Sequence, residues 1–108
     1  MADIKLVVIY PRASDPEEFE RLYLNEHMPL AKEKIKGVTK FVATKILGTP
    51  DGQPGPYQRI AELRFPSIEA LKAAATSAGG QEAVAHAISI STGGTPIILI
   101  AEEETITF

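Results

Sequence analysis

The sequence predicts an α+β domain in which strands and helices follow the order βαββαβ. Four short segments rich in β-branched or alternating apolar residues predict strands, at 4–10, 38–48, 57–65 and 97–101. Two longer segments with apolar residues at helical spacing lie between them, at 15–35 and 67–90. The loop at 49–56 is too short for a crossover, so the second and third strands should form an antiparallel pair.

The composition is typical of one soluble globular domain, residues 1–108, with 44% apolar and 23% charged residues. A net charge of −3 without a run of Lys and Arg argues against a nucleic-acid partner. The chain has no cysteine, which excludes disulfides and thiolate chemistry. The N-terminal residues lack the pattern of a signal peptide, and no apolar run approaches the roughly 20 residues that cross a bilayer. We therefore expect a cytoplasmic protein that has no membrane partner.

The first strand, Ile4–Tyr10, is apolar on both faces and ends at Pro11. Asp15 and Pro16 then predict a helix start, with a capping side chain followed by the residue that suits the first helical position. At about 100° per residue, one apolar stripe forms with His27 at its rim. Pro29 predicts a break, a restart over 29–35 and an end at Gly37. The stripe consists of Phe19, Leu22, Tyr23, Glu26 and Leu30.

The second helix should begin at Ser67, a capping residue. Gly79-Gly80 predicts an interruption, after which the helix should resume over 81–90 and bury Ala83, Val84, Ala87 and Ile88. The last strand, 97–101, falls within the segment 96–107.

This order of elements is the ferredoxin-like arrangement, a four-stranded antiparallel sheet with both helices on one face. The first and last strands are apolar on both sides, so the face without helices should be covered as well. We expect a homodimer formed through the open sheet face. The alternative is that one strand presents a different face from the one assigned.

Several segments resemble the EthD family, named after a protein of ethyl tert-butyl ether degradation, and they occur in the family's order over nearly the whole chain. The most specific is His27-Met28-Pro29-Leu30-Ala31. The others are Val8-Ile9-Tyr10-Pro11, the helix carrying Phe19 and Tyr23, Gly37, Pro54-Gly55-Pro56-Tyr57, Ala61-Glu62-Leu63-Arg64-Phe65 and Ser67-Ile68-Glu69-Ala70-Leu71.

The resemblance implies a small ferredoxin-like protein that dimerises into a dimeric α/β barrel. Relatives on that barrel include isomerases, cyclases, monooxygenases and decarboxylases, some of which work without a cofactor. The sequence departs from the family's pattern at 86–90, where members often carry Asp, Pro, Asn and an aromatic residue. Here the segment reads His-Ala-Ile-Ser-Ile, which puts the acid's role in doubt.

His27 is the candidate catalytic residue, because histidine exchanges protons near neutral pH. The alternative is structural, with the imidazole bonded to a backbone carbonyl that Pro29 leaves free. Candidate substrate-binding residues share an aromatic ring close to the predicted element ends and are Tyr10, Tyr23, Tyr57 and Phe19. For Tyr10, Tyr23 and Tyr57 the alternative is packing in the core.

His86 falls opposite the apolar stripe of its helix, so a solvated pair with Glu82 is expected. The spacing of the two histidines does not predict a metal site, and the sequence has no dinucleotide fingerprint, so we expect neither a metal nor a cofactor. The resulting hypothesis is a homodimer that binds a hydrophobic, oxygen-bearing small molecule between sheet and helices. One form of this hypothesis is a cofactor-independent degradative or biosynthetic enzyme with His27 as acid–base; the alternatives are a non-catalytic binding or accessory module, or a structural dimer with a vestigial pocket.

Overall fold

The computed structural model describes residues 3–108, and these residues form the predicted order of elements. Met1 and Ala2, which begin the segment considered for a signal peptide, lie outside the described residues. The elements are β1 (Asp3–Pro11), α1 (Pro16–Leu22), η1 (Tyr23–His27), α2 (Met28–Lys34), β2 (Lys40–Lys45), β3 (Tyr57–Phe65), α3 (Ile68–Thr76), α4 (Ala78–Ile90) and β4 (Ile97–Glu103).

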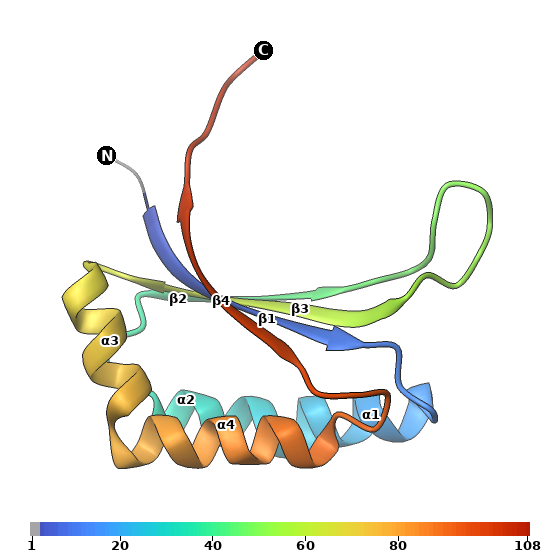
Figure 1. Ribbon diagram of the computed structural model, residues 1–108, viewed down its shortest axis with the longest axis horizontal. Helices are drawn as coiled ribbons and strands as arrows, with labels where there is room; N and C mark the ends of the chain where they lie inside the picture. Colours follow the sequence, from blue (N-terminus) through green and yellow to red (C-terminus); the bar gives the residue numbers. More distant parts are fainter. Residues whose placement is uncertain (1–2) are drawn as a thin grey trace.

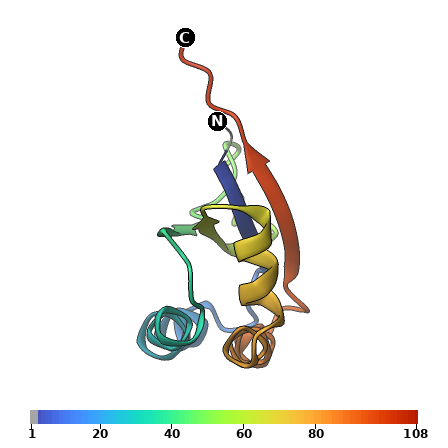
Figure 2. The same cartoon turned by 90° about the vertical axis from the view of Figure 1, so that its left-hand side faces the viewer.

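The four strands form one antiparallel sheet in the order β2-β3-β1-β4. The helices lie on one side of this sheet, and the opposite side is open (Figure 1). In the end-on view, α2 and α4 run side by side beneath the sheet (Figure 2). The prediction of a ferredoxin-like α+β fold is confirmed.

The first helical segment runs through Pro29 without a gap, so the predicted break is wrong, but the second helical piece predicted over 29–35 is present as α2 (Met28–Lys34). Asp15 caps α1 as expected, accepting a hydrogen bond from the backbone N–H of Glu18. Instead of a break, η1 forms a π-helical turn that ends in a bond from the Met28 N–H to the Tyr23 carbonyl. Because proline has no N–H, the wider turn accommodates Pro29 without leaving the helical region.

The π turn also rotates the buried face of this segment. The buried side chains are Phe19, Tyr23, His27 and Ala31, each four residues after the last. The predicted stripe assumed regular α geometry and placed Glu26 in it, but Glu26 is exposed. His27 therefore lies within the buried stripe and not at its rim.

The second helical segment divides at Ser77 and not at the two glycines. Ser77 has extended backbone angles, and its hydroxyl accepts a hydrogen bond from the Gly80 N–H, so it caps α4. Gly79 and Gly80 lie in the first turn of α4. A Cβ on Gly79 would lie 2.3 Å from the Lys34 carbonyl oxygen, and a Cβ on Gly80 would lie 2.0 Å from the Ala74 carbonyl oxygen. Close backbone approach, rather than helix breaking, explains these glycines.

Three strands differ in length from their predictions: β1 is one residue longer at each end, β2 is shorter and β4 is longer. β2 is shorter than 38–48, although hydrogen bonds from the N–H groups of Thr39 and Ile46 extend its pairing with β3 by one residue at each end. β4 runs to Glu103, because its pairing with β1 continues to Asp3. The loop between β2 and β3 and the segment after β4 both project away from the helices (Figure 1).

The core lies between the sheet and the helices. Its largest fully buried side chains are Tyr10, Phe19, Tyr23 and Leu71. Three of these four are aromatic and come from β1, α1 and η1, so the core is richest in rings beside His27. Among residues 3–108, no helix is both long enough and apolar enough to cross a membrane.

Candidate functional site

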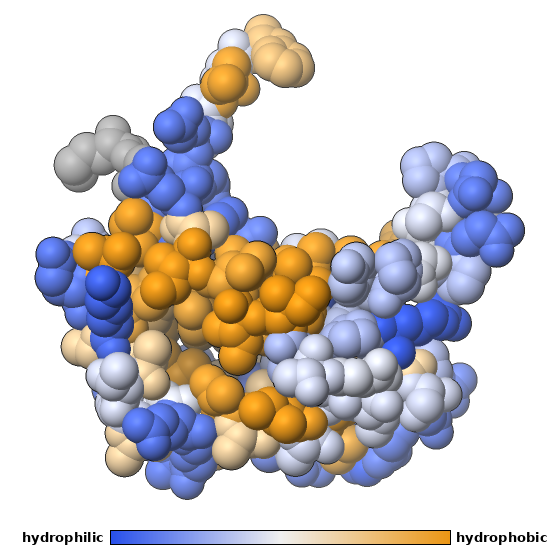
Figure 3. All heavy atoms as spheres, in the orientation of Figure 1, coloured by the Kyte–Doolittle hydropathy of each residue, from blue (hydrophilic) through white to orange (hydrophobic). Residues whose placement is uncertain are grey.

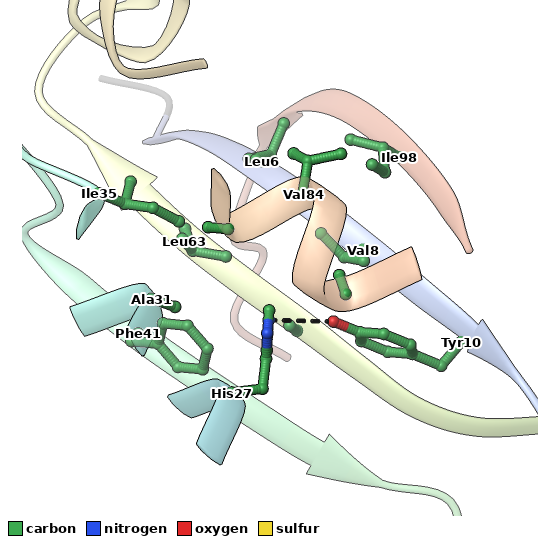
Figure 4. Close-up of a pocket in the computed structure, with 13 residues that line it drawn as sticks. Leu6, Val8, Tyr10, His27, Ala31, Ile35, Phe41, Leu63, Val84 and Ile98 are labelled. Carbon is green, nitrogen blue, oxygen red and sulfur yellow. Dashed lines mark hydrogen bonds between the residues drawn. The ribbon is translucent and has the colours of Figure 1, made fainter. Parts of the chain in front are cut away.

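A small cavity lies in the layer between the sheet and the helices. Its volume is about 30 Å³, and its walls come from all four strands, η1, α2 and α4. The lining is apolar except for His27 and the hydroxyl of Tyr10, which lie close together (Figure 4). The apolar lining residues are Leu6, Val8, Ala31, Ile35, Phe41, Ala61, Leu63, Ala83, Val84, Ala87 and Ile98.

The polar end of the cavity is formed by Tyr10 and His27. The Tyr10 hydroxyl lies 3.3 Å from Nε2 of His27, and both side chains are buried, so the two groups share a hydrogen bond. Burial, followed by the nearby His86, lowers the pKa of His27 to about 4. Burial also raises the pKa of Tyr10 well above its ordinary value. Near neutral pH the pair therefore presents a neutral phenol and a neutral imidazole, which can donate or accept a proton.

Phe19 and Tyr23 lie behind this pair and do not line the cavity. The Tyr10 ring meets those of Phe19 and Tyr23 edge to face, with centroids 5.2 and 5.5 Å apart. Tyr23 stacks on His27 at 5.8 Å. Among the described residues, the Tyr23 hydroxyl has no hydrogen-bond partner, and burial raises its pKa to about 12. These rings hold Tyr10 and His27 in place.

A buried ion pair supports the aromatic group. Arg59 on β3 bonds Glu20 on α1 through two of its nitrogens, at 2.5 and 3.1 Å, and Gln58 donates to the same carboxylate. The Arg59 guanidinium also lies over the Tyr23 ring, 5.2 Å from its centroid. Burial disfavours the charged Glu20 carboxylate, but the bonds from Arg59 and Gln58 outweigh it and lower the Glu20 pKa. The alternation of β3 places Arg59 on the same face as the buried Ala61, Leu63 and Phe65.

His86 is in contact with His27, so the predicted solvated pair with Glu82 is wrong. The two Nδ1 atoms are 2.9 Å apart, the ring planes differ by 3° and the centroids are 5.2 Å apart. That centroid separation is as large as two imidazoles allow when their facing nitrogens are this close. The rings therefore lie edge to edge in one plane, with an N–H···N bond between them. Glu82 instead pairs with Lys34 at 3.4 Å.

The remaining candidate, Tyr57, does not join the site. It begins β3, is 40% exposed and lies beside Pro11 in the strand register. Of the predicted residues, Tyr10 and His27 thus form the cavity's polar end, Phe19 and Tyr23 buttress it, and Tyr57 lies outside it. The alternative role for His27, a bond to a backbone carbonyl, is not what the structure shows, because its two ring nitrogens face Tyr10 and His86.

A second, open groove of about 880 Å³ runs beside the cavity, between α2 and β2. Ala31, Ile35 and Phe41 line both spaces and so form the partition between them. Ile35 and Phe41 are only partly buried. At the other side of the cavity, Ile98 on β4 is 39% exposed, so the lining reaches the surface there.

The site holds few groups that bind metals. Within residues 3–108, no three side chains of His, Cys, Asp or Glu converge as a metal site would require. The arrangement instead suits hydrogen bonding and proton transfer to a small molecule with an apolar body.

The open face of the sheet carries both charges and apolar side chains. At one end, Lys5 bonds Glu62 and Glu103, and Arg64 bonds Glu103. Toward the other end the face is apolar, and its residues, placed by the strand register, are Val7, Ile9, Val42, Ile60, Ile97 and Leu99. In Figure 3 apolar surface gathers over β4, whose residues Ile97 to Ile100 are each at least 39% exposed; Ile97 and Leu99 lie on the open face, and Ile98 and Ile100 on the helix side. This surface is larger than scattered apolar residues would make.

Comparisons with known proteins agree with the fold. A family model described as the EthD domain matches residues 12–87. An uncharacterised 11.0 kDa protein of Rhodococcus erythropolis, from the thcB-thcC intergenic region, is 31% identical over 102 residues, which are 94% of this chain and 96% of that protein.

Solved structures show the same arrangement. An ethyl tert-butyl ether degradation (EthD) family protein of Bacillus halodurans has a TM-score of 0.86 and 27% identity, over 94% of this chain and 99% of the other. A dimeric ferredoxin-like protein of unknown function from Bacteroides fragilis has a TM-score of 0.63 and 16% identity, over 94% and 96% of the two chains. At that identity the second likeness concerns the fold alone.

Proposed function

The chain belongs to the EthD family, and on that premise we propose that it binds a hydrophobic, oxygen-bearing small molecule beside Tyr10 and His27. The observation that carries the proposal is the position of these two groups, which are the polar end of an otherwise apolar cavity. An apolar enclosure with a few converging polar groups is the usual composition of a small-molecule site. A carbonyl or phenol oxygen is the group that this end would bind.

The ligand needs more room than the closed cavity offers. A cavity of about 30 Å³ holds roughly one or two water molecules, whereas ligand pockets usually measure roughly 300–1,000 Å³. Movement of Ile35 and Phe41 would join the cavity to the groove between α2 and β2. Binding would therefore open the partition and insert the ligand's oxygen between Tyr10 and His27.

The chemistry we propose is proton transfer at a carbon next to a carbonyl, without a cofactor. The Tyr10 hydroxyl donates a hydrogen bond to the carbonyl oxygen, and Nε2 of His27 takes a proton from the adjacent carbon. The electron pair of the broken C–H bond moves into the enolate, whose oxygen Tyr10 stabilises. A neutral His27 suits the role of base, and the lowered pKa of about 4 keeps it neutral near pH 7.

A simple aryl ketone, 4-hydroxyacetophenone, tests this proposal. Calorimetry would measure its affinity, and NMR in D₂O would measure exchange of its methyl protons. We expect binding and exchange in the wild-type protein, and a loss of exchange of roughly a hundredfold in His27→Gln. Tyr57→Phe is the matched control, because Tyr57 lies outside the cavity. Equal exchange in wild type and His27→Gln would refute the role of His27.

A non-catalytic binding module is the second candidate. It is favoured by one observation: both ring nitrogens of His27 already have partners, Tyr10 and His86. In that case the wild-type protein would bind 4-hydroxyacetophenone, and His27→Gln would bind it more weakly. The methyl protons of the ketone would not exchange faster with the protein than in buffer alone.

The same proposal includes a homodimer formed through the open sheet face. The exposed apolar residues of β4 support it, as does the description of the Bacteroides fragilis protein, which has this fold, as dimeric. A second copy would bury the apolar part of each face, and the projecting loop 46–56 and the segment after β4 would flank it (Figure 1).

A further inference from the structure

We propose that His86 and Glu26 form a proton outlet that connects His27 to the protein surface. His86 is then a positioning residue, and the inference rests on the acid–base role proposed for His27. The groups form a line that starts at the cavity. Tyr10 faces Nε2 of His27, Nδ1 of His27 faces Nδ1 of His86, and Nε2 of His86 lies 4.0 Å from Oε1 of Glu26.

The exposed fraction of the side chains increases along this line, from the cavity to the surface. His27 is 6% exposed, the side chain of His86 25% and that of Glu26 52%. His86 thus contacts His27 through its Nδ1 and faces the exposed Glu26 through its Nε2. The planar, edge-to-edge arrangement of the two imidazoles aligns the N–H bond of one ring with the lone pair of the other, which is the geometry a proton needs to cross.

The charge of Glu26 favours one direction for the hydrogen bonds that join His86, His27 and Tyr10. A neutral imidazole has one N–H, and an ionised carboxylate only accepts. The Glu26 carboxylate lies 4.0 Å from Nε2 of His86, too far for a direct hydrogen bond, but its negative charge favours the His86 tautomer with the proton on Nε2 and a lone pair on Nδ1. His27 must then donate from Nδ1, and its own Nε2 accepts from the Tyr10 hydroxyl. The opposite direction would turn a lone pair of His86 toward the carboxylate.

This arrangement leaves the lone pair of His27 at the cavity, where a base is needed. When Nε2 of His27 takes the proton of the ligand's C–H bond, the proton on its Nδ1 crosses to Nδ1 of His86. His86 is then an imidazolium beside the Glu26 carboxylate, and it releases its Nε2 proton to solvent. His27 ends neutral with the ligand's proton on Nε2, and the methyl group takes up deuterium when this proton exchanges with solvent before the enolate is reprotonated. The burial that lowers the His27 pKa to about 4 is no obstacle, because the charge does not stay on the buried ring.

The other charged groups near His86 are engaged elsewhere. Glu82 lies one turn earlier on α4, and its carboxylate pairs with Lys34 of α2. Glu82→Gln is therefore a matched control for Glu26→Gln, because both remove a negative charge near His86 but only Glu26 faces its Nε2.

The first test determines which nitrogen of each imidazole carries a proton, and it does not require catalysis. Long-range ¹H–¹⁵N correlation spectra of the two imidazoles should show His27 protonated at Nδ1 in the wild-type protein at pH 7. In His86→Leu the His27 proton should move to Nε2. Finding it on Nε2 in the wild type, or on Nδ1 in both proteins, would overturn the outlet.

The second test measures the rate at which the methyl protons of 4-hydroxyacetophenone exchange with solvent. His86→Ala should slow exchange roughly ten- to hundredfold without changing the ketone's affinity, and added imidazole should restore the rate. Glu26→Gln should slow exchange and Glu82→Gln should not. If His27→Gln abolishes exchange but His86→Ala leaves it unchanged, the outlet is wrong and the role of His27 stands. If neither variant changes exchange, the proposed function itself fails.

Discussion

Both faces of the sheet carry apolar side chains along β1 and β4, but the helices cover only one of them (Figure 2). On the covered face, one chain supplies every group of the candidate site, including its supporting ion pair. On the open face, the charges pair with one another and the apolar residues are left exposed. The comparison teaches that the candidate site is built from one chain, whereas the open face leaves apolar side chains that the proposed homodimer would cover.

The largest effect is expected for the buried ion pair of the covered face. Arg59→Met leaves the Glu20 carboxylate buried without its partner, which should lower the free energy of unfolding by about 3–5 kcal/mol. Urea unfolding followed by circular dichroism would measure the loss. The double variant Arg59→Met/Glu20→Gln should recover most of it, because no uncompensated charge remains. A double variant as unstable as the single one would contradict the role given to this pair.

A charge on the open face should have the next largest effect. Leu99→Glu would place a carboxylate in the proposed dimer interface and weaken dimerisation by at least about 3 kcal/mol, or a hundredfold. Light scattering over a concentration series would measure this.

Ile100→Glu is the matched control, because Ile100 is the next residue on the same strand, is similarly exposed and points to the other face. If both variants remain dimeric, or both become monomeric, the assignment of the interface to the open face is wrong.

The covered face should also make stability depend on pH. The pKa of His27 is about 4 in the folded chain, below the ordinary 6.5, so the unfolded chain binds more protons between these values. Stability is therefore full above about pH 6.5 and falls as the pH drops toward 4, by up to about 3 kcal/mol. Urea midpoints across this range would measure the slope. His27→Gln should flatten it, and an unchanged slope in that variant would place its origin elsewhere.

The smallest changes in stability are expected when the hydroxyl group of Tyr10 or of Tyr23, two tyrosines of the covered face, is removed. Tyr10→Phe removes a hydrogen bond to His27 and should lower the free energy of unfolding by about 1 kcal/mol. Tyr23→Phe removes a buried hydroxyl that has no partner among the described residues, so stability should stay the same or rise slightly. Thermal melting would compare the two. The reverse order would show that the Tyr23 hydroxyl, and not that of Tyr10, is the bonded one.

The order of elements and the helix starts were predictable because they depend on local signals. Asp15 and Ser67 cap the helices at the expected residues, and the loop at 49–56 joins an antiparallel pair. His27 and Tyr10 could be paired as candidates because the fold brings the end of the first strand beside the first helix.

The rest of the site depends on a geometry that the sequence pattern does not carry. The π turn shifts His27 and Ala31 into the buried stripe, whereas an α-helical wheel places Glu26 there. The same regular spacing placed Ile88 in the core and His86 in solvent, but Ile88 is 48% exposed and His86 meets His27. The alternation of β3 places Arg59 on the buried face, but its partner Glu20 is 39 residues away, so no local pattern could reveal the ion pair.

The position of a bound phenol tests the central claim most directly. A crystal of the protein soaked with 4-bromophenol would show the bromine by its anomalous signal. We expect the ring between the sheet and α4, with its oxygen within hydrogen-bonding distance of Nε2 of His27, and Ile35 or Phe41 displaced. A phenol bound only in the groove between α2 and β2, with the Tyr10–His27 hydrogen bond intact, would contradict the account.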